Sequence, residues 1–388
     1  MRWRALRPVG EPLPPISRDT IEPAGVLPTG YKGHFVQSGT AALALALLTA
    51  KARSRNERNR VLLPAYGCPD MVAAIVYAGL VPELVDTAPN EPFLNLELLE
   101  KQLDDGVLAV IAAHFLGLAE RVEAVQDLAQ KVGAWVIEDS AQRLPGSGGI
   151  GPVADLVVLS FGRGKPAGAL GGGALLVKND PFEKIHPETW IGPPTRPLLP
   201  AGIKRLAYNL AIRPLPYAMA TRLPGLALGE TRYRPLESIQ ALDPARRKVA
   251  LNTMLHLSGV APRRACHQLR SALLQLSGLQ LVSNHMVTDG CEGLTRLPIL
   301  FDSRTLRDGA HESLSAAGLG ASTMYGKALP DLEGMPYVPR VQRYLPQFAR
   351  HFADRLLTIP VHSGVHRRHI DGIASLLVRI ASFPSAEI

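Results

Sequence analysis

The chain has 388 residues, of which 46% are hydrophobic and 20% charged, a composition typical of a soluble globular protein with a sizeable core. Its 42 basic and 34 acidic residues give a net charge of +8 that is spread along the chain, which favours anionic small ligands and disfavours nucleic acid. No stretch approaches the roughly 20 apolar residues that cross a bilayer, and residues 1–4 are not followed by the apolar run of a signal peptide.

The three cysteines, Cys68, Cys266 and Cys291, are far apart and odd in number. This pattern predicts neither a disulfide framework nor a zinc site. We therefore expect a protein of the reducing cytoplasm that holds no metal.

Residues 1–33 are rich in proline and glycine and show little periodicity, so they predict an extended arm. Ser38, Gly39 and Thr40 then precede an Ala/Leu run that continues to Ala50, which predicts a helix starting at these residues. The free N–H groups at such a helix start suit a phosphate, although the same residues also serve as an ordinary cap.

Apolar strands and helical segments then alternate along the chain. This alternation predicts a mostly parallel sheet with helices on both faces. Ligands of such sheets lie beyond the carboxyl ends of the strands, where we expect Thr40, Tyr66, His114, Asp139 and Lys165 to converge. The predicted strands are 61–64, 81–85, 107–112 and 134–137, and the predicted helices are 70–77, 92–103 and 120–132.

A lysine-bearing loop, Ser160-Phe-Gly-Arg-Gly-Lys165, separates two further predicted strands, 156–159 and 174–177. Burying an amine among glycines and aliphatic side chains is costly, and it favours the neutral form that attacks a carbonyl. Lys165 is therefore a candidate Schiff-base lysine, although lysines in Gly-rich turns are usually solvated. The loop is not a P-loop, because Leu159 and Pro166 replace the glycine and the hydroxyl residue that a P-loop requires.

The second half of the chain contains two segments of different character. Residues 190–230 are basic, apolar and interrupted by prolines. They predict an insertion that packs on a dimer or covers the site, or one that meets a membrane surface or an apolar, lipid-linked substrate. From about residue 251 the pattern indicates an α+β unit, with helices at 251–279, 303–317 and 369–381 and strands at 296–301, 321–325 and 356–361.

Five motifs occur in the order and spacing of the DegT family of sugar aminotransferases, which use pyridoxal 5′-phosphate (PLP) and have the type I fold. The motifs are Ser38-Gly-Thr-Ala-Ala-Leu, Leu63-Pro-Ala-Tyr, His114-Phe-Leu-Gly, Val136-Ile-Glu-Asp-Ser-Ala-Gln142 and the lysine loop. The chain resembles this family over residues 34–180 and again at Arg355-Leu-Leu-Thr-Ile-Pro-Val-His362. The resemblance implies an α/β fold with a large PLP-binding domain over 34–250, which includes the insertion at 190–230, and a small C-terminal domain over 251–388.

The resemblance also implies roles for individual residues. Lys165 would carry PLP and then move a proton at the substrate Cα, while Asp139 would pair with the pyridine nitrogen. Gln142 would contact the ring or its 3-oxygen. The phosphate would be held by the backbone amides of Gly39 and Thr40 and by the hydroxyl of Ser160.

Other positions match the family less closely. The residue that stacks on the ring falls on Cys68 in strict register, with Tyr66 two residues away. His114 matches a family histidine that serves either function or the fold. The family's Gly-Glu-Gly-Gly is Leu-Gly-Gly-Gly at 170–173, which loses a carboxylate. The asparagine that reaches the partner subunit's phosphate is replaced by Arg232.

By this resemblance we expect a homodimeric aminotransferase that moves an amino group from an amino acid, with L-glutamate the favoured donor, to a nucleotide-linked keto-sugar. Its product would enter polysaccharide or glycoconjugate biosynthesis. One alternative is a non-transaminating dehydratase or lyase of the same family, although dehydratases replace the lysine with histidine and Lys165 is retained. The others are a PLP-binding regulator and a transaminase acting on a lipid-linked substrate.

Overall fold

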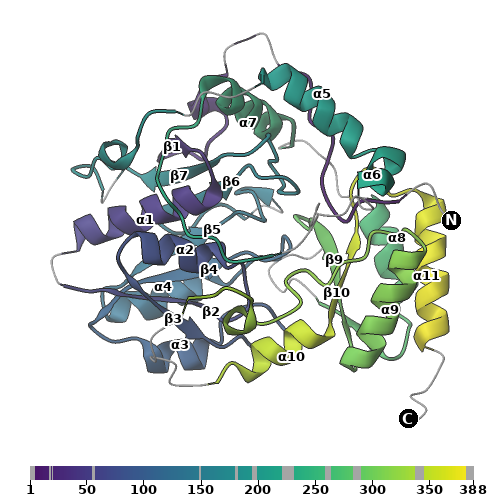
Figure 1. Ribbon diagram of the computed structural model, residues 1–388. Coiled ribbons are helices and arrows are strands. Elements are labelled where there is room, and N and C mark those ends of the chain that lie inside the picture. The colour runs from purple at the N-terminus through teal and green to yellow at the C-terminus, as the bar shows by residue number, and fades with distance from the viewer. Residues whose placement is uncertain are drawn as a thin grey trace.

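The computed structural model shows two β-sheets with helices packed around them (Figure 1). A seven-stranded sheet carries the first half of the chain, and a three-stranded sheet carries the C-terminal part. The structure describes residues 5–16, 19, 21–54, 57–147, 150–179, 182–194, 199–220, 231–257, 264–282, 290–336 and 345–381.

The large sheet has the strand order β3-β2-β4-β5-β6-β7-β1. β7 alone runs antiparallel to its neighbours, so the sheet is mostly parallel as expected. The edge strand β1 lies partly inside the segment predicted to be an extended arm. The strands are β1 (Tyr31–Val36), β2 (Arg60–Pro64), β3 (Val81–Val85), β4 (Val107–Ala113), β5 (Trp135–Asp139), β6 (Leu156–Ser160) and β7 (Gly173–Lys178).

Helices cover both faces of this sheet, because its strands are apolar on both sides. In β2, Val61 and Leu63 join the core cluster that contains α1 and α2, whereas Leu62 joins the cluster beneath α3 and α4. A third cluster forms where α7 packs on β6 and β7. The helices are α1 (Gly39–Arg53), α2 (Asp70–Tyr77), α3 (Leu96–Gln102), α4 (Val122–Lys131) and α7 (Pro244–Leu257).

The small sheet is antiparallel, with the order β10-β9-β8, and it packs with helices that also contact one another. The predicted strand at 321–325 is wrong, because there only Ser322 forms an isolated bridge to Thr358. The predicted long helix at 251–279 is instead the end of α7, a segment outside the described residues, and α8. The elements are α8 (Arg264–Leu273), β8 (Leu279–Leu281), β9 (Arg296–Phe301), α9 (Arg304–Ala316), α10 (Gln347–Arg355), β10 (Leu356–Pro360) and α11 (Arg367–Ala381).

The insertion contributes two helices, α5 (Ala201–Ala211) and α6 (Pro214–Ala220), along one side of the molecule (Figure 1). The N-terminal arm runs between these helices and the C-terminal unit. The N–H of Ala5 donates to the carbonyl of Pro214, and the N–H of Leu6 donates to that of Gly318. None of the described helices is long and apolar enough to cross a membrane.

The cysteine pattern led to a wrong expectation. Cys266 on α8 and Cys291 form a disulfide across 25 residues, and Cys68 is the remaining thiol. The 25-residue separation of Cys266 and Cys291 had suggested that they do not pair. The chain turns back after α8, however, and places the two side chains together in the core. The disulfide anchors α8 to the segment that leads into β9.

We expect Cys266 and Cys291 to resist alkylation in the native, unreduced protein, while Cys68 reacts once the protein is denatured. A loop of this length constrains the unfolded chain, so the pair Cys266→Ser/Cys291→Ser should lower the free energy of unfolding by about 3 kcal/mol. Peptide mapping and denaturant melts measure both effects. Cys68→Ser is the control, and modification of all three thiols before reduction would contradict the pairing.

Candidate functional site

A cavity of about 270 Å³ lies at the carboxyl ends of the central strands. Eight of the residues predicted from the sequence line it, and they come from α1 and from the segments that follow β2, β4, β5 and β6. They are Gly39, Thr40, Cys68, His114, Asp139, Gln142, Ser160 and Lys165.

The start of α1 forms one wall of this cavity. The hydroxyl of Ser38 accepts the N–H of Ala41 and caps the helix, which leaves the first-turn amides of Gly39 and Thr40 without an intrahelical partner. A Cβ on Gly39 would lie 2.8 Å from the Cβ of Ser160, and one on Gly173 would lie 2.5 Å from the carbonyl oxygen of Ser38. Only glycine at both positions lets the helix start approach β6 and β7 this closely.

Asp139 ends β5 and lines the same cavity. Its carboxylate accepts the N–H of Ala141 at 2.9 Å. Burial raises the pKa of Asp139 above its usual value, and the Ala141 bond and the nearby charge of Lys165 offset this only in part. The site therefore holds a carboxylate that is more basic than one in water and suited to accept or share a proton.

Lys165 follows β6 in a loop closed by backbone hydrogen bonds, including that from its own N–H to the carbonyl of Gly162 at 3.2 Å. The lysine is half-buried at the cavity wall, whereas the sequence had suggested a buried residue. Leu170 on the far side of the loop has a left-handed backbone, with φ of 67°. A non-glycine residue in this conformation is strained, and such strain concentrates at functional sites.

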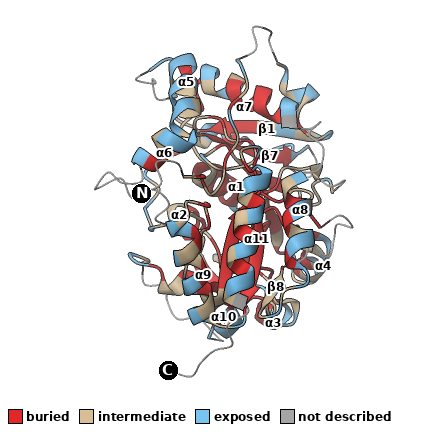
Figure 2. Ribbon diagram, turned by 90° about the vertical axis from the view of Figure 1, so that its right-hand side faces the viewer, coloured by how far each residue is buried: buried red, intermediate tan, exposed pale blue. Residues whose placement is uncertain are grey.

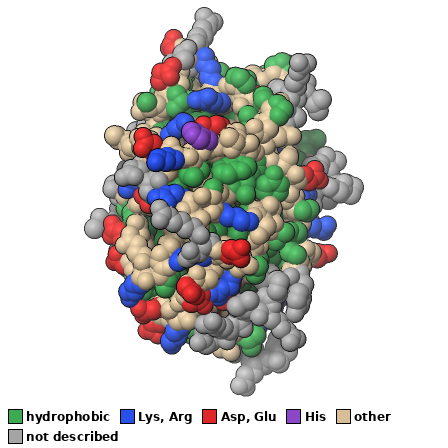
Figure 3. Space-filling model, turned by 90° about the vertical axis from the view of Figure 1, so that its left-hand side faces the viewer, with side chains coloured by type: hydrophobic (Ala, Val, Ile, Leu, Met, Phe, Trp, Pro, Cys, Tyr) green, Lys and Arg blue, Asp and Glu red, His purple; other side chains and the backbone are tan. Residues whose placement is uncertain are grey.

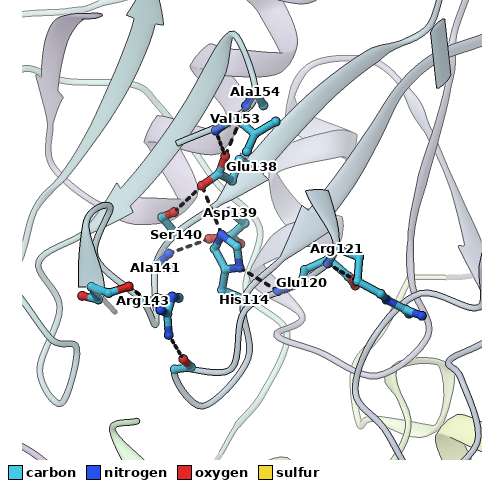
Figure 4. A network of polar contacts seen from close by, with 12 residues as sticks. His114, Glu120, Arg121, Glu138, Asp139, Ser140, Ala141, Arg143, Val153 and Ala154 are labelled. Carbon is cyan, nitrogen blue, oxygen red and sulfur yellow. Dashed lines mark hydrogen bonds and ion pairs between the residues drawn. The ribbon is translucent and has the colours of Figure 1, made fainter. Parts of the chain in front are cut away.

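His114 is fixed in a single neutral form by two hydrogen bonds (Figure 4). The backbone N–H of Glu120 donates to its Nδ1 at 2.9 Å, so that nitrogen carries no proton. The other nitrogen, Nε2, lies 3.1 Å from Glu138 and donates to that carboxylate. Both ring nitrogens are thus occupied by the protein, although His114 lines the cavity.

Two buried carboxylates around this histidine have opposite pKa shifts. Burial alone would raise the pKa of Glu138, but hydrogen bonds from His114 and from the backbone of Val153 and Ala154 outweigh it and leave the pKa below its usual value. For Glu120, burial prevails over its hydrogen bonds and raises the pKa. Glu138 is therefore the ionised partner that orients the imidazole.

Gln142 connects the cavity to the C-terminal unit. Its side-chain oxygen accepts the N–H of Leu116 at 3.0 Å, and its amide nitrogen donates to the hydroxyl of Tyr325 at 3.1 Å. Arg143 adds a second connection, because its guanidinium binds the carbonyls of Gly117, at 2.6 Å, and Glu292. These contacts hold the loop after β4 against the segment that precedes β9.

Two predicted residues lie elsewhere. Tyr66 is fully buried among the rings of Phe115, Tyr325 and Phe352 and does not line the cavity. Cys68 does line it, and burial raises the pKa of its thiol to about 12, which keeps it protonated at neutral pH. Arg232 lies outside the cavity of its own chain.

Two further residues were not predicted from the sequence: Phe115, and Arg296, which does not line the cavity itself. Phe115 lines the cavity and was detectable only as the neighbour of His114. Arg296 begins β9, and among the described residues its guanidinium meets only the hydroxyl of Thr358, at 3.4 Å, and no carboxylate. Burial lowers the pKa of Arg296 to about 10, while the nearby Tyr325 and Tyr217 partly offset this effect. No single-sequence signal distinguishes it from the other arginines.

Glu138→Gln should lower the free energy of unfolding by about 2 kcal/mol or more at pH 7, because charged hydrogen bonds are lost and donors are left without an acceptor. A carboxylate with a depressed folded pKa stabilises above its unfolded value and loses that effect as the pH falls through the folded value. The deficit should therefore shrink below the ordinary pKa of 4.5. Denaturant melts against pH measure it, with the exposed Glu97→Gln as control, and a deficit that is constant with pH would contradict this account.

Comparison with known proteins finds relatives of the part of the chain that lines the cavity. Residues 33–187 match the DegT/DnrJ/EryC1/StrS aminotransferase family. A UDP-N-acetyl-3-dehydro-alpha-D-glucosamine 3-aminotransferase from Acidithiobacillus ferrooxidans is 32% identical over 146 residues, which are 37% of this chain and 39% of that protein. A dTDP-3-amino-3,4,6-trideoxy-alpha-D-glucose transaminase from Streptomyces venezuelae is 29% identical over 150 residues, 38% of each chain. The matched stretch thus spans less than half the length of these relatives.

The fold itself is similar over a much larger part of the chain. A Streptococcus pneumoniae structure described as a sugar aminotransferase in its PMP form superposes with a TM-score of 0.68, covering 90% of this chain and 88% of that one at 18% identity. This agreement confirms the type I fold that the motifs predicted. Residues 33–187, which hold α1 to α4 and β2 to β7, are therefore similar to the DegT/DnrJ/EryC1/StrS aminotransferase family.

Proposed function

We propose that the protein is a PLP-dependent aminotransferase that transfers an amino group from an amino acid to a keto-sugar. The observation that carries the proposal is one cavity that joins a lysine, a basic buried carboxylate and the first-turn amides of a helix that Ser38 caps. These three features fit the aldehyde, the ring nitrogen and the phosphate of PLP. The alignments with a UDP-sugar and a dTDP-sugar enzyme support a nucleotide-linked acceptor, which also suits the net charge of +8.

The residues that would hold PLP agree chemically with its groups. The amides of Gly39 and Thr40 and the hydroxyl of Ser160 offer donors to a phosphate at the positive end of the α1 dipole. Asp139, made more basic by burial, would accept a hydrogen bond from the protonated pyridine nitrogen and keep it protonated. Bound in this way, PLP supplies an electron sink for the bond that is broken at the substrate Cα.

The protein's own groups would then move the proton and exclude water. Lys165 lies at the cavity wall and would carry a proton to and from the substrate Cα. His114 cannot serve as a second acid or base in its present contacts, because Nδ1 accepts from the backbone and Nε2 donates to Glu138. Its ring would instead present a flat surface to the cofactor, the role that we expected of Tyr66 or Cys68.

Arg296 would bind the carboxylate of the amino donor. Its guanidinium has no carboxylate partner among the described residues. Tyr325, which contributes to its electrostatic environment, hydrogen-bonds Gln142 at the cavity. A fork of N–H donors is the group that binds a carboxylate in two-point geometry, and L-glutamate is the donor that the family resemblance favours.

A homodimer and a cytoplasmic location remain proposals. Arg232 would act only across a dimer interface, because it lies outside the cavity of its own chain. Apolar side chains gather near the centre of the face shown in Figure 3, between charges of both signs, and this face is a candidate for that contact. The Cys266–Cys291 pairing is the observation that argues against the cytoplasm.

Purified protein with PLP should show a visible absorbance band that L-glutamate bleaches as the cofactor takes the amino group. Lys165→Ala should lack the band, and the exposed Lys184→Ala should keep it. A band that glutamate leaves unchanged would point to another donor or to a dehydratase or lyase. If the wild type fails to bind PLP, the proposal is wrong.

Arg296→Ala should raise the KM for L-glutamate by about 10- to 100-fold with a smaller change in kcat, because a charged hydrogen-bonding partner of the substrate is lost. Arg296→Lys should recover part of the loss. Single-turnover bleaching of the PLP band at varied glutamate concentration gives both constants. An unchanged KM in both variants would assign Arg296 to the fold alone.

A further inference from the structure

Helix α5 exposes its apolar face to solvent. Ile203, Leu206 and Leu210 lie three and four residues apart, so they share one side of the helix, and they are 54%, 67% and 53% exposed. Ala207 and Ala211 on the same side are exposed as well. Only Ala201 of this helix is buried. Figure 2 shows the exposed surface along α5 and α6.

The polar face of α5 points inward. The side chain of Asn209 accepts the N–H of Leu13 at 2.8 Å and donates to its carbonyl at 3.0 Å. Arg205 donates to the same carbonyl at 3.4 Å, and burial raises the pKa of Tyr208. A surface helix normally has the reverse arrangement, with its apolar side toward the core. Here polar contacts with the N-terminal arm fix α5 and leave its apolar side to something outside the chain.

The exposed apolar surface continues on α6, and the segment that forms it is basic in sequence. Leu215 and Met219 are 47% and 58% exposed. The sequence between Glu188 and Glu230 contains no acidic residue, but it contains Arg196, Lys204, Arg205, Arg213 and Arg222. Leucines combined with lysine and arginine and lacking acidic groups are characteristic of helices that lie in the interface of an anionic membrane.

Charge also favours an anionic membrane over a second copy of the chain as the partner of this surface. A two-fold contact pairs a surface with itself, so it would bring Lys204 and Arg213 close to their own counterparts with no acidic group from the segment to neutralise them. An anionic lipid surface supplies the missing charge. With 11 and 7 residues, α5 and α6 are too short to span a bilayer but long enough to lie on one.

We propose that α5 and α6 dock the protein on an anionic lipid surface, with Ile203, Leu206, Leu210, Leu215 and Met219 in the acyl boundary and with Lys204 and Arg213 at the headgroups. The docked helices are separated from the lysine loop by the arm alone. Gly10 of the arm lies between them: a Cβ added to Gly10 would lie 3.0 Å from the hydroxyl of Tyr208 on α5 and 3.8 Å from the Cα of Gly164 in the lysine loop. The docking surface therefore lies beside the candidate site, one layer of chain away from it.

Flotation of the purified full chain tests the proposal, with vesicles of phosphatidylcholine containing phosphatidylglycerol and with vesicles of phosphatidylcholine alone. The wild type should float with the anionic vesicles, and high salt should reduce the bound fraction. Leu206→Glu/Leu210→Glu should reduce binding by more than about tenfold, because two leucines no longer enter the lipid. Leu274→Glu/Leu345→Glu, at two other exposed leucines, adds the same charge and should still float.

Three outcomes would overturn the proposal. The first is wild type that stays with the soluble fraction, and the second is equal flotation of the α5 variant and its control. The third is a change from dimer to monomer in the α5 variant by analytical ultracentrifugation without any vesicle binding by the wild type, which would identify the surface as a self-contact. The PLP absorbance band, which does not depend on docking, shows that each variant is folded and separates failure of this proposal from failure of the aminotransferase activity.

Discussion

The close seating of α1 against the end of β6 and the start of β7 is the constraint on which the candidate site depends. Ser38 forms a β-bridge with Gly172. Because Gly39 and Gly173 have no Cβ, the side chain of Ser160 can lie close to Gly39 and the backbone of Ser38 close to Gly173. If this approach were wider, the helix start, Ser160 and the lysine loop would no longer bound one cavity. The capped start of α1 therefore lines the cavity with N–H donors, because the sheet places Ser160 and the lysine loop beside it.

The buried polar network behind the cavity has a different function. Burying Glu138, Glu120 and His114 together would be destabilising if any one of them lacked partners. Each has them: the backbone of Val153 and Ala154 holds Glu138, and the backbone of Leu94 and Arg121 holds Glu120. The consequence is rigidity, because the imidazole has one protonation state and one orientation. Such a group positions a ligand but does not exchange protons with it.

Much of this arrangement could be predicted from the sequence, since strand ends in a parallel sheet converge and because motifs mark them. Lys165, Asp139 and the start of α1 were located in this way. Position along a strand does not say which way a side chain turns, and Tyr66 was therefore expected at the cavity although it packs in the core. The disulfide and Arg296 depend on contacts between the two units, and a single sequence carries no trace of such contacts.

The orientation of helix α5 could not be predicted from its hydrophobic pattern. Its periodicity identifies an amphipathic helix, and the ordinary inference would bury Ile203, Leu206 and Leu210. The structure turns the opposite side toward the N-terminal arm, because the side chain of Asn209 hydrogen-bonds both backbone groups of Leu13, which lies 196 residues earlier in the chain. Exposed leucines contribute almost nothing to the stability of the isolated chain, since burial is the source of their stabilising effect. The free energy that these side chains can still release is available only to a surface that covers them. The segment between Glu188 and Glu230 has basic residues and no acidic one, which favours an anionic surface.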